Sequence, residues 1–90
     1  MANILNDTRI EIRLYSIDDY KEGIQEHRNS IFDMRERIIR DLDQAEDVRQ
    51  ILNVLSYGVR YVEEQQMYID YNQRKIIQTY SDIMDVIGEN

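Results

Sequence analysis

Cysteine, proline and tryptophan are absent from this 90-residue chain, and glycine occurs only three times. Without cysteine, neither a disulfide framework nor a thiolate metal site can stabilise a small core. Without proline, and with so little glycine, the chain lacks the residues that usually end helices and mark turns. The sequence therefore predicts long helices in a single domain over residues 1–90. A core this small is marginally stable, which favours help from a second copy or a partner.

Basic residues are also scarce, because 18 Asp and Glu face 11 Lys and Arg and give a formal charge of −7. An acidic chain is repelled by phosphate backbones and anionic lipids, so neither direct nucleic-acid binding nor membrane insertion is expected. The pattern of a signal peptide or a membrane span is not seen, which predicts a cytoplasmic or particle-associated protein. In its many Ile, Asn, Asp and Tyr residues the composition resembles that of small proteins from AT-rich bacteria and their phages.

Apolar residues recur at alternating steps of three and four along most of the chain. This heptad spacing predicts helices packed side by side, as in a coiled coil, along a seam over residues 17–87. The seam consists of Ile17, Tyr20, Ile24, His27, Ile31, Met34, Ile38, Ala45, Val48, Leu52, Leu55, Val59, Val62, Gln66, Ile69, Gln73, Ile76, Tyr80, Ile83 and Ile87.

The N-terminal residues 1–16 show a different pattern. Ile10, Ile12 and Leu14 alternate with charged residues, as they do in a half-buried strand. Ser16 is suited to cap a helix that starts directly after it. We therefore expect a short extended segment over residues 1–16, followed by the first helix.

The seam is interrupted once, at Asp41, inside a strongly acidic stretch. A turn is predicted there, between a first helix over 17–41 and a second over 44–87. Asp43 is placed to cap the free amides of the second helix, and Glu46 follows three residues later. These elements predict an all-α fold, a long helical hairpin.

One continuous helix is the alternative, because the heptad register is the same on both sides of Asp41. Against it, Phe32, Ile39 and Leu42 widen the apolar face of the first helix beyond what a two-stranded coiled coil buries. This width favours the hairpin and predicts that the hairpin forms an oligomer.

A second face of the later helix is rich in tyrosine. Projected at 100° per residue, its members lie nearly opposite the seam residues Val59 and Val62, so this helix is apolar or aromatic on two sides. Tyrosine is enriched at protein interfaces, which predicts a partner interface here. The alternative is that both faces are ordinary core. The proposed interface residues are Val54, Tyr57, Tyr61, Tyr68 and Tyr71.

Three polar residues occupy seam positions: His27, Gln66 and Gln73. Polar side chains at such positions select partner or register, although the two glutamines are equally consistent with a solvated surface. His27 is the only histidine, and its sequence neighbours provide neither a nucleophile nor further metal ligands at helical spacing. We therefore expect no catalytic residues, no metal site and no cofactor.

An acidic patch is formed by Asp41, Asp43, Glu46 and Asp47. Two functions follow from these features. The first is a non-enzymatic interaction module, a structural or adaptor protein that assembles with itself or docks on a larger protein through its helical faces. The second is a small acidic inhibitor that imitates nucleic acid in the basic cleft of an enzyme, and its binding would weaken as salt is raised.

The short acidic hairpin also resembles the WXG100 family of secreted proteins, which carry a Trp-x-Gly motif between two helices. Ser56-Tyr57-Gly58 is the nearest match to that motif, with serine in place of tryptophan, and no clear counterpart of the family's C-terminal signal follows Tyr80. The resemblance implies a secreted helical hairpin.

Overall fold

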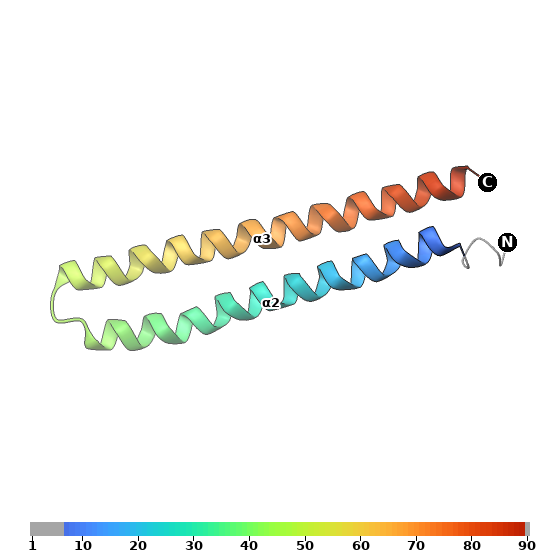
Figure 1. The fold of residues 1–90 in the computed structure, drawn as a ribbon. Helices are drawn as coiled ribbons and strands as arrows, with labels where there is room; N and C mark the ends of the chain where they lie inside the picture. The colour runs from blue at the N-terminus through green and yellow to red at the C-terminus, as the bar shows by residue number, and fades with distance from the viewer. Residues whose placement is uncertain (1–6, 90) are drawn as a thin grey trace.

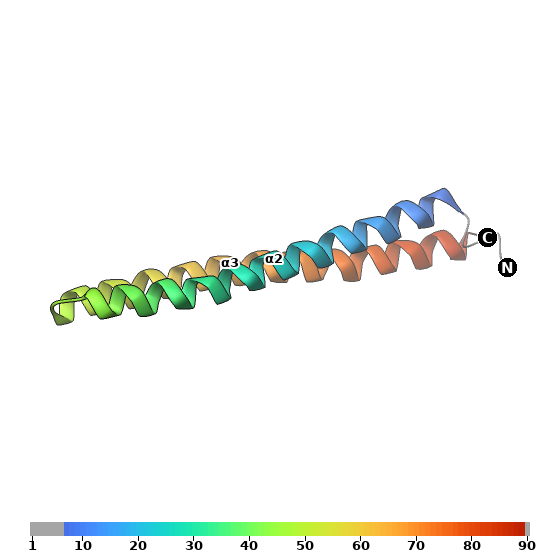
Figure 2. The same cartoon turned by 90° about the horizontal axis from the view of Figure 1, so that it is seen from below.

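The computed structural model describes residues 7–89 and contains two long helices. Helix α2 spans Thr8–Gln44 and helix α3 spans Val48–Gly88. They run antiparallel, with the start of α2 and the end of α3 at one end of the hairpin and the turn at the other (Figure 1). Viewed after a quarter turn, the two ribbons cross each other at a shallow angle (Figure 2). The predicted all-helical hairpin is confirmed, and the alternative of one continuous helix is wrong.

The hairpin is a thin rod. Its extents are 66 × 16 × 12 Å and its radius of gyration is 20.2 Å. A compact domain of this length would have a radius of gyration of about 12 Å. Within residues 7–89, each helix therefore packs against only one other helix, and much of the surface of both helices is exposed.

The predicted extended segment is wrong within residues 7–16, because α2 already begins at Thr8. The side chain of Asp7 accepts a hydrogen bond from the backbone N–H of Arg9 and so caps the helix. The residues read as a strand also fit a helix: Ile10 is followed seven residues later by Ile17, and both are buried, whereas Ile12 is 59% exposed. A helix satisfies its own backbone groups, while a strand needs a neighbouring strand.

The turn lies at residues 45–47, a few residues later than predicted. Asp47, and not Asp43, caps α3, because its side chain accepts from the backbone N–H of Gln50 at 2.8 Å. In return, the side chain of Gln50 accepts from the backbone N–H of Glu46 at 2.6 Å. This reciprocal pair of hydrogen bonds fixes where α3 begins, and α2 continues to Gln44.

Along α2 the predicted seam faces α3. Ile17, Ile24 and Met34 are buried, and the intervening seam residues from Tyr20 to Ile38 are half-buried. The four-residue and three-residue steps keep these side chains on one stripe of the helix. On this helix the heptad spacing identifies the buried face.

Along α3 the predicted seam is exposed in its first half. Leu52 and Val59 point to solvent, and the residues buried against α2 are Val54, Gly58 and Gln65 instead. In the second half, Ile69 from the seam is buried. A heptad stripe drifts by about 20° per heptad around a straight helix, so it cannot face one neighbour along the whole length unless the two helices supercoil to follow it.

Gly58 is where the two helices approach most closely among the glycines. A Cβ atom added there would lie 2.5 Å from Cδ1 of Ile38, whereas one added at Gly23 would lie 3.4 Å from the side chain of Asn72. The missing side chain of Gly58 therefore makes room for Ile38, and this contact holds the first half of α3 with its Gly58 face toward α2.

Candidate interaction surface

The first half of α3 carries an exposed apolar stripe, which we call the aliphatic stripe. Its side chains are spaced by four, three, four and three residues, and Val48 and Val59 are 71% and 56% exposed. No Asp or Glu occurs between residues 48 and 62, although the whole chain has 18. The stripe consists of Val48, Leu52, Leu55, Val59 and Val62.

The stripe continues sideways into a groove between the helices. This groove has a volume of about 460 Å³, and Val62 of the stripe lines it together with Ile38 and Ile39 of α2. Ile39 and Phe32 are the large apolar side chains that α2 exposes in its second half. An apolar surface shared by two elements is a feature of interaction sites, whereas single exposed apolar residues are ordinary.

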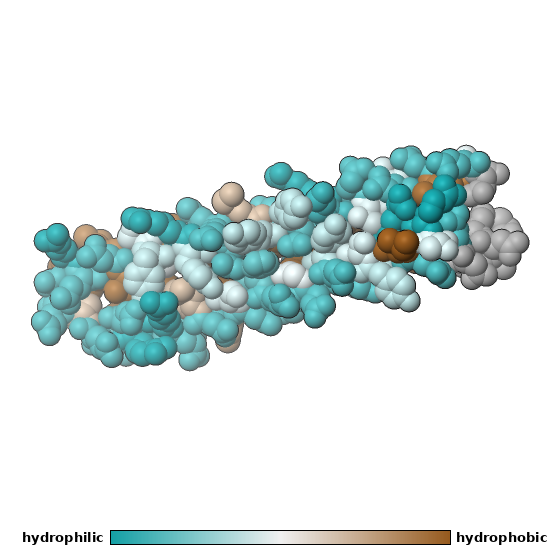
Figure 3. Space-filling view, viewed as in Figure 1, coloured by the Kyte–Doolittle hydropathy of each residue, from teal (hydrophilic) through white to brown (hydrophobic). Residues whose placement is uncertain are grey.

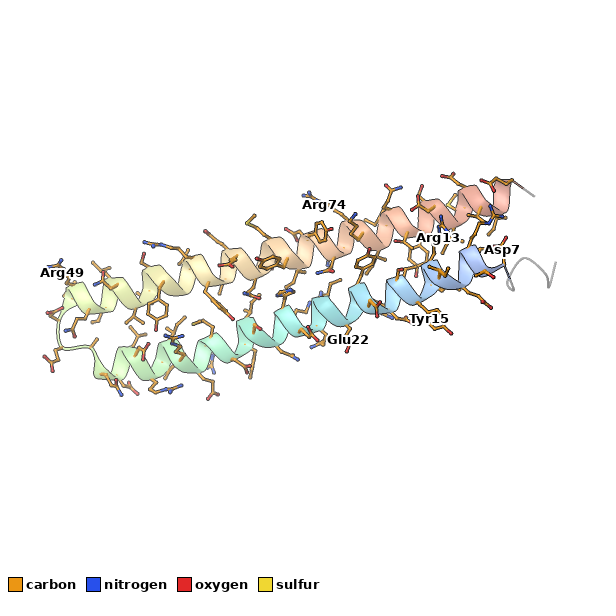
Figure 4. All side chains as sticks on the ribbon, in the orientation of Figure 1. Asp7, Arg13, Tyr15, Glu22, Arg49 and Arg74 are labelled. Carbon is orange, nitrogen blue, oxygen red and sulfur yellow. The ribbon has the colours of Figure 1, made fainter. Side chains whose placement is uncertain are left out.

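The face drawn in Figure 3 is largely hydrophilic, with hydrophobic atoms in small patches. The side-chain view from the same direction shows charged residues along the outer edges of both helices, among them Glu22 on α2 and Arg74 on α3 (Figure 4). On this face, polar and charged side chains thus cover most of the surface.

The predicted tyrosine interface is divided by the structure. Val54 is buried, and Tyr57 and Tyr61 are half-buried, so these three residues belong to the contact with α2. Tyr68 and Tyr71 remain exposed, at 46% and 56%. Relative to the sequence prediction, the two faces of α3 have exchanged roles in its first half, because the tyrosine side is turned inward and the aliphatic side outward.

Tyr57 is held by a polar cluster from α2. Its hydroxyl donates to Oδ2 of Asp41, and the guanidinium of Arg37 lies 5.6 Å from the centre of its ring. The hydrogen bond to the Asp41 carboxylate, together with burial and the negative charge, raises the pKa of Tyr57 above its usual value. The carboxylate of Asp41, which interrupts the apolar seam, therefore has a partner in Tyr57.

His27 meets a glutamine that sequence reasoning missed. Its Nδ1 lies 2.6 Å from Oε1 of Gln65, an arrangement satisfied when the imidazole carries its proton on Nδ1, and its ring stacks on Tyr68 at 4.9 Å. The predicted register residues Gln66 and Gln73 are both exposed. The sequence does contain a signal for Gln65: steps of three and four residues lead from Gly58 through Tyr61 to Gln65 and place all three on the side of α3 that faces α2.

The exposed tyrosines border a shallow depression of about 370 Å³. Tyr68, Tyr71, Met67 and Glu64 line it, all of them from α3. The ammonium of Lys75 lies 5.5 Å from the centre of the Tyr71 ring. Because one helix supplies the whole lining, this depression lacks the converging polar groups of a small-molecule site.

The acidic patch does not act as one exposed unit. Asp41 binds Tyr57 and lies 3.9 Å from Nε of Arg37, while Asp47 caps α3. Asp43 and Glu46 are exposed at the turn. Two of the four carboxylates thus have structural tasks within the hairpin.

Three further features of residues 7–89 concern metal binding, buried polar groups and membrane spanning. In this part of the chain no three His, Cys, Asp or Glu side chains gather as a metal site requires. Over the same residues every buried side-chain nitrogen and oxygen has a hydrogen-bond partner. Neither helix is long and apolar enough to cross a membrane.

No protein-family model matches the chain, and comparisons with curated proteins and with solved structures give no match either. The structure places Ser56-Tyr57-Gly58 inside α3, ten residues or so beyond the turn, whereas the WXG100 motif lies between its two helices. The turn of this hairpin is built instead by Asp47 and Gln50.

Proposed function

We propose that this protein is a non-enzymatic interaction module, a structural or adaptor component that associates with itself through the exposed faces of its hairpin. The aliphatic stripe is the observation that carries the proposal. Its residues repeat with the spacing of a helix–helix contact, yet they are exposed and not buried against α2. A second helical surface packed on the stripe would remove these side chains from water.

The total exposed surface supports the same proposal. The chain exposes 7129 Å², whereas a compact monomer of 10.9 kDa exposes about 5,600 Å². The excess of about 1,500 Å² exceeds the roughly 800 Å² that each partner covers in an interface of standard size. A two-helix rod of this length thus has enough surplus surface for association without any change of fold.

The polar clusters also support a role without turnover. His27 is oriented by the neutral amide of Gln65, while general-base histidines are usually paired with a carboxylate and a nucleophile. The perturbed Tyr57 lies between the helices and is bound to Asp41. Both groups make contacts between α2 and α3, and such contacts keep the exposed surface of the hairpin in one arrangement.

Sedimentation of the full chain over a range of concentrations tests the proposal. We expect a dimer or larger species for the parent, and a shift toward monomer for the double variant Leu52→Ser with Leu55→Ser. Ile77→Ser is the matched control, because Ile77 is a 70% exposed residue of the same helix outside the stripe. Circular dichroism checks that all variants stay helical. A parent that is monomeric at every concentration contradicts self-association. The stripe would then be a binding site for a different protein.

A further inference from the structure

Four residues of the aliphatic stripe form a pattern that is the same in both directions. They read Val-Leu-Leu-Val, with spacings of four, three and four residues, at Val48, Leu52, Leu55 and Val59. All four side chains are exposed on one side of α3, in the half next to the turn. Such a pattern pairs with itself around a twofold axis perpendicular to the helix, because each residue then meets one of its own type.

We infer that two copies of this chain pair antiparallel through α3, with Val48 of one copy opposite Val59 of the other and Leu52 opposite Leu55. This inference rests on the self-association proposed above and specifies its geometry. The steps of three and four residues place these side chains as alternating knobs along one seam. The same alignment brings Val62 opposite Ala45, a half-buried residue at the turn.

The distribution of charge identifies a second copy as the occupant. Two chains that each carry −7 repel one another through their carboxylates. The segment from Val48 to Val62 contains none of the 18 carboxylates, and its charged side chains are Arg49 and Arg60, so two copies approach here away from their carboxylates and without burying an unpaired acid. A basic partner, in contrast, would be attracted to the carboxylate-rich surfaces elsewhere on the hairpin.

Antiparallel and parallel pairing place the same residue at very different distances from its counterpart. In the antiparallel pair, Val48 of one copy lies eleven residues along the helix axis from Val48 of the other, or about 16 Å. Val48 and Val59 of different copies lie directly opposite. In a parallel pair every residue would instead face its own counterpart.

Crosslinking of single-cysteine variants measures these distances, because the natural chain has no cysteine. Val48→Cys and Val59→Cys are made separately in the full chain, distinguished by isotope labelling, and refolded alone or as a mixture. A thiol crosslinker shorter than 16 Å is then added. Tyr15→Cys, at an exposed site on α2 (Figure 4), measures the background from random collisions.

We expect the mixture to give the crosslinked pair of Val48→Cys with Val59→Cys in at least several-fold higher yield than either variant gives with itself. Self-crosslinking of each variant alone should match the Tyr15→Cys background. Efficient self-crosslinking of both variants overturns the antiparallel arrangement in favour of a parallel one. If the parent sediments as a dimer but all yields stay at background, this pairing is wrong while self-association stands. A monomeric parent refutes both.

Discussion

Gly58 offers a direct test of how α3 is turned toward α2. Alanine is more favourable than glycine in a helix interior by about 1 kcal/mol, so Gly→Ala within a helix normally stabilises. At Gly58 the new Cβ would lie 2.5 Å from Cδ1 and 3.3 Å from Cγ1 of Ile38. Overpacking of this kind costs about 1–3 kcal/mol. We therefore expect Gly58→Ala to lower the free energy of unfolding, by up to about 2 kcal/mol after the helix gain is subtracted.

Two further variants separate these contributions. Gly23→Ala is the matched control, because its Cβ would meet Asn72 at 3.4 Å, an ordinary contact, and it should stabilise by about 0.5–1 kcal/mol. Ile38→Val removes the clashing Cδ1 atom and by itself should cost about 0.5–1.5 kcal/mol. In the Ile38→Val background, Gly58→Ala should change from destabilising to stabilising, a coupling of about 1–3 kcal/mol.

Urea unfolding followed by circular dichroism measures all four variants, at one fixed protein concentration because association contributes to apparent stability. Gly58→Ala that stabilises as much as Gly23→Ala, with no coupling to Ile38→Val, would refute the contact. That result would instead support the orientation of α3 predicted from the sequence, in which Val59 and the rest of the seam face α2.

Four other substitutions have defined outcomes. Asp47→Ala should lower the free energy of unfolding by about 1 kcal/mol, because α3 loses its cap. Asp43→Ala should change it by less than about 0.5 kcal/mol. Equal effects of the two variants in urea unfolding would contradict the observed start of α3. Because the pKa of Tyr57 is raised in the folded state, its contribution is complete below the usual tyrosine pKa and is lost as pH rises through the raised value. Thermal melts above pH 10 should therefore fall less steeply for Tyr57→Phe, and an unchanged slope would show that Asp41 does not hold this hydroxyl. Tyr61→Ala should lower the free energy of unfolding by about 2 kcal/mol or more, because the half-buried side chain of Tyr61 lies against α2. An unchanged melting temperature would place Tyr61 outside the core.

The fold class followed from the sequence for simple physical reasons. The absence of proline allows long helices, and the three-and-four spacing from Ile17 to Ile38 marks one stripe that must be buried. That stripe is the face of α2 in contact with α3. His27 lies on the same face, half-buried beside Gln65, at the position that its spacing gives it.

The start of α2 shows where local pattern fails. Ile10, Ile12 and Leu14 satisfy the period of two expected for a strand, and Ile10 with Leu14 and Ile17 also satisfies the helical period. A stretch of eight residues, 10–17, cannot distinguish the two periods. The capping hydrogen bond at Asp7 and the burial of Ile10 accompany the helix.

The sequence by itself determined that this protein is built of long helices, and it favoured a turn near the acidic middle over one continuous helix, because propensity and periodicity act within each helix. It did not determine which side of α3 faces α2, because that helix has two apolar sides and periodicity is the same for both. Only the tertiary structure decided this, through two contacts between residues far apart in the sequence: the missing side chain of Gly58 makes room for Ile38, and the hydroxyl of Tyr57 donates to Asp41. The aliphatic stripe is exposed for that reason.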